Sequence, residues 1–124
     1  MKFRDRYFLI KNLSELVEEM NKELKFVIVE GKNDKEVLRM LGFKRKIFLV
    51  NKKAKIKGKY TILTDFDKEG EYLARVLSKE YGEKYLANIY REKFFCLLKS
   101  CGIREIQAVK KSIKMLRRVD LILF

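Results

Sequence analysis

Short apolar runs alternate with amphipathic segments along this chain, and this alternation limits the folds that it can adopt. Four runs rich in β-branched and aromatic residues are typical of strands, at residues 25–30, 46–50, 59–64 and 85–90. Other segments carry apolar residues at helical spacing, at residues 33–42, 69–82, 92–102 and 103–116. Strands that alternate with helices predict an α/β fold with about four mostly parallel strands flanked by helices.

The chain of 124 residues is long enough for one domain with a single core. An amphipathic N-terminal helix is expected at residues 12–24, a core over about 25–90, and a C-terminal helical extension over about 91–124. The last residues, VDLILF, are apolar but follow no clear period. They are open to three interpretations: an extra strand, a packing tail or a partner contact.

The charge balance indicates a polyanionic partner. There are 30 lysines and arginines against 17 acids, a net charge of +13. A strong basic excess favours nucleic acid, either RNA or DNA, as the partner. The abundance of Lys and Glu is also typical of proteins from thermophiles, which would account for the high charged fraction. No apolar run reaches the roughly 18 residues that span a bilayer, so no membrane contact is expected. Cys96 and Cys101 have no metal-site spacing and there is no histidine, which fits a reduced, cytoplasmic setting.

Acidic residues follow two of the expected strands. Glu30 ends the first strand, and Asp65 and Asp67 follow the third. In parallel sheets ligands bind at the carboxyl ends of strands, so neighbouring strands would bring these acids to one edge. Converging carboxylates repel unless their pKa values rise or a cation binds. Carboxylate oxygens suit Mg²⁺, so the pattern predicts a magnesium site.

The stretches VIVEGKND and TILTDFDKEGE together resemble the Toprim domain family, over residues 25 to about 90. The second stretch is similar to the D-x-D-x-E-G-E motif of type IA topoisomerases, and the first to small Toprim nucleases. Among Toprim proteins the chain most resembles short stand-alone members from archaea and thermophilic bacteria. The resemblance implies a Toprim, Rossmann-like fold and Mg²⁺-dependent phosphoryl transfer on nucleic acid, with Mn²⁺ as an alternative ion. A small nuclease that processes RNA is the activity it favours.

The resemblance also implies residue roles. Glu30 matches the acid or base that moves a proton in the family, and Asp65 and Asp67 match its metal-binding pair. Glu69 matches a third metal-binding acid, but as a first-turn residue it would equally complement the helix dipole. Asp34 matches an acid that serves a second metal, with a structural role at a helix start as the alternative.

Two glycines flank these acids. Gly31 and Gly70 are expected to allow a tight passage from strand to helix and to let the backbone approach the metal or a phosphate closely. Lysines complete the expected nucleic-acid contacts: Lys32 directly after Glu30, and a loop group of Lys52, Lys53, Lys55 and Lys57. A second basic group lies in the last helical segment, at Lys110, Lys111, Lys114, Arg117 and Arg118. The alternative interpretation of both basic groups is that they are ordinary solvated surface with no binding role.

Three other functions remain open. The chain is alternatively a non-catalytic module that binds nucleic acid or ribosomes, or a subunit that lends its site to a larger primase-like or topoisomerase-like complex. A phosphotransferase of the haloacid dehalogenase type also places D-x-D after a strand. That family has threonine where this chain has Glu69, and it gives Glu30 no role.

Overall fold

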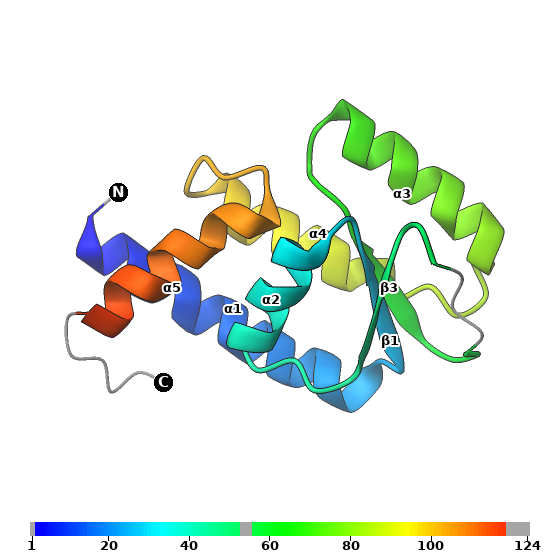
Figure 1. The fold of residues 1–124 in the computed structure, drawn as a ribbon, viewed down its shortest axis with the longest axis horizontal. Helices are drawn as coiled ribbons and strands as arrows, with labels where there is room; N and C mark the ends of the chain where they lie inside the picture. Colours follow the sequence, from blue (N-terminus) through cyan, green and yellow to red (C-terminus); the bar gives the residue numbers. More distant parts are fainter. Residues whose placement is uncertain (1, 53–55, 119–124) are drawn as a thin grey trace.

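The computed structural model describes residues 2–52 and 56–118. Five α-helices, three strands and a short 3₁₀ helix follow one another in these residues (Figure 1). Their bounds are α1 Phe3–Glu23, β1 Phe26–Val29, α2 Lys32–Met40, β2 Lys46–Leu49, β3 Tyr60–Leu63, α3 Lys68–Tyr81, α4 Asn88–Lys99, η1 Ile106–Ala108 and α5 Val109–Arg118. A helix separates β1 from β2 and another follows β3, as the sequence pattern predicts, while the described residues between β2 and β3 form no helix.

The three strands form one parallel sheet in the order β2-β1-β3. All four residues of β1 and all four of β3 are buried, as expected for strands covered on both faces. Val29 is paired with Leu49 on one side and with Leu63 on the other, so the strands end level with one another. The α/β class with a parallel sheet is confirmed, and the residues after β1 and β3 leave the sheet side by side.

Alternate residues of the strands point into two separate apolar clusters. Phe26, Ile28, Tyr60 and Ile62 face α3 and pack against its Ala74 and Leu77. The opposite face carries the larger cluster, which includes Val27, Val29 and Leu63 and residues of α1, α2, α4 and α5. In Figure 1, α3 accordingly lies apart from the other helices, on its own side of the sheet.

The expected strand at 85–90 is wrong. Leu86 makes a single parallel bridge to Tyr60, and the chain then enters α4 at Asn88. Tyr90, Phe94 and Leu98 are buried at four-residue spacing, which is the period of a helix and not of a strand. The described residues therefore contain three strands, and a fourth is not formed, because this apolar run is the first turn of a longer amphipathic helix.

The first helix is longer than expected. It begins at Phe3 rather than near residue 12, because Leu9, Ile10 and Leu13 extend the same buried stripe toward the N-terminus. None of the helices in residues 2–52 and 56–118 has the length and apolar character needed to cross a membrane. The tail at 119–124, for which the sequence leaves several roles open, is outside the described residues.

Candidate functional site

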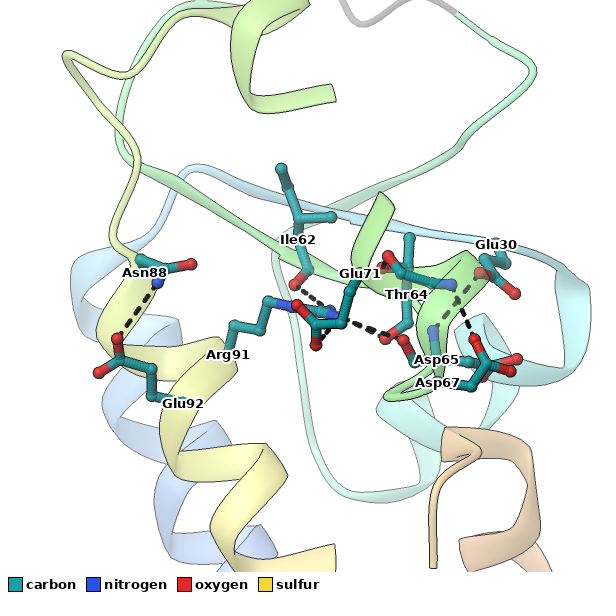
Figure 2. Close-up of polar contacts among 10 residues, drawn as sticks. Glu30, Ile62, Thr64, Asp65, Asp67, Glu71, Asn88, Arg91 and Glu92 are labelled. Atoms are coloured by element: carbon teal, nitrogen blue, oxygen red, sulfur yellow. Dashed lines mark hydrogen bonds and ion pairs between the residues drawn. The ribbon is translucent and has the colours of Figure 1, made fainter. Parts of the chain in front are cut away.

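Glu30 and Asp65 meet at the carboxyl edge of the sheet because β1 and β3 are parallel neighbours that end level. The backbone N–H of Asp65 points to Glu30 Oε1, with an N···O distance of 3.4 Å (Figure 2). The two carboxyl groups also lie within hydrogen-bonding reach of each other. The expected convergence of these two acids is therefore present in the fold.

This proximity changes the ionisation of Asp65. Burial, followed by the negative charge of Glu30 and a hydrogen bond to it, raises the pKa of Asp65 from 3.8 to about 7. The charges of Glu105 and Asp67 act in the same direction. Asp65 thus carries a proton over much of the neutral range, and a bound cation could take the place of that proton.

Asp67 has a structural task at the start of α3. It is the N-cap residue, and its Oδ1 accepts a hydrogen bond of 2.7 Å from the backbone N–H of Gly70. This contact satisfies one of the free N–H groups of the first turn. Asp67 is exposed and adds charge near Asp65, and Glu69 is exposed in the same turn.

Asp34 is also used at a helix start. It is 6% exposed and accepts a hydrogen bond of 3.1 Å from the backbone N–H of Gly31, the N-cap of α2. Its burial, with the charges of Asp65 and Glu105, raises the pKa of Asp34 in spite of this hydrogen bond. Asp34 therefore lies near the acidic pair while holding the turn between β1 and α2.

An open hollow of about 260 Å³ lies beside the acidic pair. Its lining residues come from the β1–α2 turn, from the end of β3 and from η1, and are Glu30, Gly31, Lys32, Asn33, Asp34, Asp65 and Gln107. A methyl group on Gly31 would meet no protein atom within 4 Å, and its φ of −150° suits any residue. The expected tight passage at Gly31 is therefore not what requires glycine in this fold, and the space beside it remains free for a ligand.

Gly70 is required by packing. A methyl group there would overlap the carbonyl oxygen of Asp65 and come within 2.5 Å of its carbonyl carbon. The hydroxyl of Thr64 donates a hydrogen bond of 2.7 Å to the carbonyl oxygen of Gly70. The first turn of α3 is thus pressed against the backbone that carries Asp65, which is the close approach that the sequence predicts at this glycine.

Sequence reasoning missed Arg91, whose guanidinium organises the end of β3. Arg91 is 5% exposed and donates hydrogen bonds to the carbonyl oxygens of Ile62 (3.1 Å), Thr64 (2.8 Å) and Asp65 (3.1 Å). It also pairs with the carboxylate of Glu71 at 2.9 Å, and Figure 2 shows it reaching from α4 toward these groups. The only sequence signal was a basic residue within the apolar stripe of a helix.

Glu105 was missed as well. It directly precedes η1, and its charge is close enough to raise the pKa of both Asp65 and Asp34. The segment that carries it is tied to the β3–α3 loop, because Phe66 donates its backbone N–H to the carbonyl oxygen of Arg104 at 2.9 Å. No motif marks Glu105, since it is forty residues from Asp65 in the sequence.

Lys52 of the expected basic loop lies toward the other end of α3. Tyr81, the last residue of α3, donates its hydroxyl to the carbonyl oxygen of Lys52 at 3.3 Å, and its ring lies against Phe26 and Tyr60 at the beginning of the strands. The 14 residues of α3 span roughly 20 Å. Lys57 is exposed near the start of β3, and Lys53 and Lys55 are outside the described residues. Of the lysines that the sequence predicts to bind nucleic acid and that the structure describes, only Lys32 lines the hollow.

The groups that could bind a metal ion at this edge are a small number of carboxylate oxygens. Among the described residues, no three acids or cysteines are arranged as a ready metal-binding group. The arrangement instead offers one close pair, Glu30 and Asp65, with Asp67 beside it and partly engaged by α3. Mg²⁺ commonly binds one or two carboxylates and keeps its remaining water ligands, so the pair is compatible with this ion.

A solved structure of a protein from Aquifex aeolicus shares the fold. The TM-score is 0.60, and the match covers 79% of this chain and 98% of that protein, with 24% sequence identity. At this identity the likeness concerns the fold alone, and it shows that this arrangement of helices and strands occurs in an experimentally determined structure.

Two relatives match the sequence over most of its length, and both are UPF0292 proteins. One, from Methanocaldococcus jannaschii, is 33% identical over 122 residues, which cover 86% of this chain and 91% of the relative. The other, from Thermococcus onnurineus, is 32% identical over 113 residues, which cover 84% of this chain and 77% of the relative. No family model matches the chain.

These comparisons contradict the assignment to the Toprim family, because no Toprim model matches and the relatives carry another family name. The resemblance rested on two short acidic motifs, and acids at the carboxyl ends of parallel strands are not specific to one family. The extent and identity of the match to the relatives show instead that this chain belongs to the UPF0292 family.

Proposed function

We propose that this chain is a Mg²⁺-dependent nuclease, which hydrolyses phosphodiester bonds of nucleic acid at the hollow beside Glu30 and Asp65. The observation that carries the proposal is the close pairing of these two carboxyl groups at a partly buried place, where burial and then the charge of Glu30 raise the pKa of Asp65 to about 7. Such a pair needs a proton or a cation between its members, and shifted pKa values concentrate at functional sites.

The surroundings of the pair suit a phosphate substrate. Lys32 lines the same hollow and would hold an anionic oxygen of the substrate. The free space beside Gly31 would let the phosphate approach the backbone at the first turn of α2. The net charge of +13 would offset the repulsion between a polyanion and the acids.

The acids would divide the work between metal binding and proton transfer. Asp65 and Asp67 would hold Mg²⁺, which supplies neutralisation of the negative charge that develops on the phosphoryl oxygens. Glu30 would accept the proton of the attacking water as its oxygen bonds to phosphorus. The bond from phosphorus to the leaving oxygen then breaks, and that oxygen takes a proton from solvent. Arg91 would keep the Asp65 backbone in place through its three carbonyl contacts.

The second candidate is a non-catalytic module that binds nucleic acid. One observation favours it: Asp34 and Asp67 both have structural hydrogen bonds at helix starts, which account for these acids without a metal. Glu30 accepts a longer hydrogen bond of 3.4 Å from the backbone N–H of Asp65, but its proximity to the Asp65 carboxyl group opposes ionisation of the pair. The nuclease is therefore the preferred proposal.

A cleavage panel tests the proposal. Purified protein would be incubated with labelled single-stranded and double-stranded RNA and DNA, in Mg²⁺, Mn²⁺ or EDTA. Cleavage is expected with either ion and not with EDTA. Glu30→Gln is expected to lower the cleavage rate by about 100-fold or more, the usual contribution of a general base. Asp65→Asn is expected to remove metal-dependent cleavage.

Glu80→Gln is a matched control, because Glu80 is an exposed acid near the far end of α3. It removes the same charge and is expected to leave the cleavage rate unchanged. Cleavage at wild-type rates by both Glu30→Gln and Asp65→Asn would show that the reaction does not take place at this pair of acids. Tight binding with no cleavage of any substrate would favour the non-catalytic module.

A further inference from the structure

The segments that line the hollow also contact α5 or lead into it. Asn33 of α2 donates to Gln107 of η1 at 3.2 Å, and Lys110 of α5 pairs with Glu36 of α2 at 2.8 Å. Asn33 and Gln107 also line the hollow, and α5 begins two residues after Gln107. In Figure 1, the beginning of α5 lies beside the beginning of α2, which is the helix whose first turn lines the hollow.

The exposed side of α5 is basic apart from Met115, which is 38% exposed. The helix has ten residues, VKKSIKMLRR, of which five are basic and none is acidic. Val109, Ser112, Ile113 and Leu116 are buried against the core. Lys111, Lys114 and Arg118 are exposed at the spacing i, i+3, i+7, which places them in one stripe on the opposite side. Glu36 is the neighbouring acid on α2, and Lys110 engages it directly.

We propose that a strand of nucleic acid bound at the hollow continues along α5, with its phosphates against Lys111, Lys114 and Arg118. This inference rests on the proposed function, because it takes the hollow as the place of reaction. From Lys111 to Arg118 the helix rises about 10 Å, close to the rise of three nucleotides of one strand. The stripe therefore matches the charge, the spacing and the position of a polyanion that leaves the hollow.

This surface replaces the loop that the sequence favoured. The backbone of Lys52 is held by Tyr81 at the end of α3, roughly a helix length of 20 Å from Asp67. A strand that contacts both the loop and the acidic pair would have to pass along all of α3. The beginning of α5 is closer to the hollow, because Gln107 just before it lines the hollow and Lys110 in its first turn pairs with Glu36 of α2.

Two double variants with the same loss of charge separate the two surfaces. Lys111→Gln/Lys114→Gln alters the stripe, and Lys52→Gln/Lys57→Gln alters the loop. Binding of short fluorescein-labelled RNA and DNA would be measured by anisotropy in EDTA over a range of salt concentrations. The stripe variant is expected to weaken binding by about tenfold and to lower the slope of log K against log salt by about 2. The loop variant is expected to change affinity by less than about twofold.

Several results would overturn the inference. They are equal losses from both variants, a larger loss from the loop variant, and no binding of nucleic acid by the wild-type protein. The same variants would be tested against vesicles of anionic phospholipid, and a stripe effect confined to vesicles would assign the surface to a membrane instead. Thermal unfolding checks that each variant folds, and Lys111→Arg/Lys114→Arg is expected to keep wild-type affinity.

The inference and the proposed function fail separately. Binding in EDTA needs no metal and no turnover, so a stripe-dependent affinity stands even if the cleavage panel finds no reaction. Conversely, cleavage that depends on Glu30 but not on the α5 stripe would retain the nuclease and remove this docking surface.

Discussion

At the scale of single residues, Asp65 is the group whose ionisation works against the fold. Its carboxyl lies beside Glu30, and burial together with that neighbouring charge raises its pKa to about 7 from 3.8. The folded protein therefore keeps a proton on Asp65 that the unfolded chain releases at lower pH. Stability and pH must then be linked through this one residue.

We predict that metal-free protein loses stability as the pH rises from about 4 to about 7. In this window the folded state binds more protons than the unfolded state, so the contribution of Asp65 is fully present below 3.8 and is lost as the pH passes 7. Urea unfolding of the wild-type protein and of Asp65→Asn in EDTA isolates this contribution as a difference. The variant is expected to be the more stable protein at pH 8, because its amide carries no charge beside Glu30.

A difference between the two proteins that does not change from pH 4 to pH 8 would contradict this prediction. Such a result would mean that Glu30 and Asp65 turn away from each other in solution. The pairing that carries the proposed function would then be lost with it.

At the scale of elements, the start of α3 is fitted against the end of β3. Thr64 bonds to the carbonyl of Gly70, Asp67 caps the helix through the N–H of the same glycine, and Gly70 lies on the Asp65 backbone. Arg91 binds the other side of this loop from α4. The position of Asp65 thus depends on two helices that cover opposite faces of the sheet.

Gly70→Ala is predicted to destabilise the protein by about 2 kcal/mol or more. Alanine has the higher helix propensity, by about 1 kcal/mol, but its methyl group would overlap the Asp65 carbonyl group and force the backbone to move. The free energy of unfolding in urea measures the cost. The variant is also expected to lose cleavage, because the movement displaces Asp65.

Gly31→Ala provides the matched control for Gly70→Ala. Its methyl group meets no protein atom, so the cost is expected to stay within about 1 kcal/mol, the usual penalty of alanine at an N-cap. Equal losses of unfolding free energy in the two variants would contradict the close contact between Gly70 of α3 and the Asp65 backbone.

At the scale of the whole molecule, a strongly basic protein keeps four of its 17 acids close together at one edge of the sheet. Glu30, Asp34, Asp65 and Glu105 come from the β1–α2 turn, the end of β3 and the segment before η1. These three segments are far apart in the sequence, so the mutual repulsion of the four acids is a cost to the complete tertiary structure. A cation at this edge would remove that cost.

We therefore predict that Mg²⁺ raises the melting temperature. At a concentration ten times its dissociation constant, the ion would stabilise the fold by about 1.4 kcal/mol, or about 5 °C for a domain of this size. Asp65→Asn and Asp67→Asn are expected to reduce this shift strongly in a thermal unfolding titration. Asparagine can still cap α3, so Asp67→Asn separates the charge from the hydrogen bond to Gly70.

Glu80→Gln is the control in this titration as well, and it is expected to keep the full shift. An equal shift in all four proteins would mean that Mg²⁺ acts on the overall charge of the molecule. The acids at the sheet edge would then not form a metal site.

The sequence by itself determined the parallel α/β arrangement and the meeting of Glu30 with Asp65. Both follow from local patterns: buried β-branched runs become parallel strands, and the residues after neighbouring strands leave at the same edge. The close approach at Gly70 was predictable for the same reason, since a tight strand-to-helix turn needs a residue without a side chain.

Only the tertiary structure decided the features that depend on distant segments. Residues 85–90 continue into a helix because Tyr90 packs with Phe94 in the core, although the short run alone fits a strand equally well. Arg91 and Glu105 reach the site from segments that carry no motif, and Lys52, the loop lysine held by Tyr81, ends up away from it. Local sequence sets the periodicity of each element, but contacts between elements depend on how their apolar faces pack together.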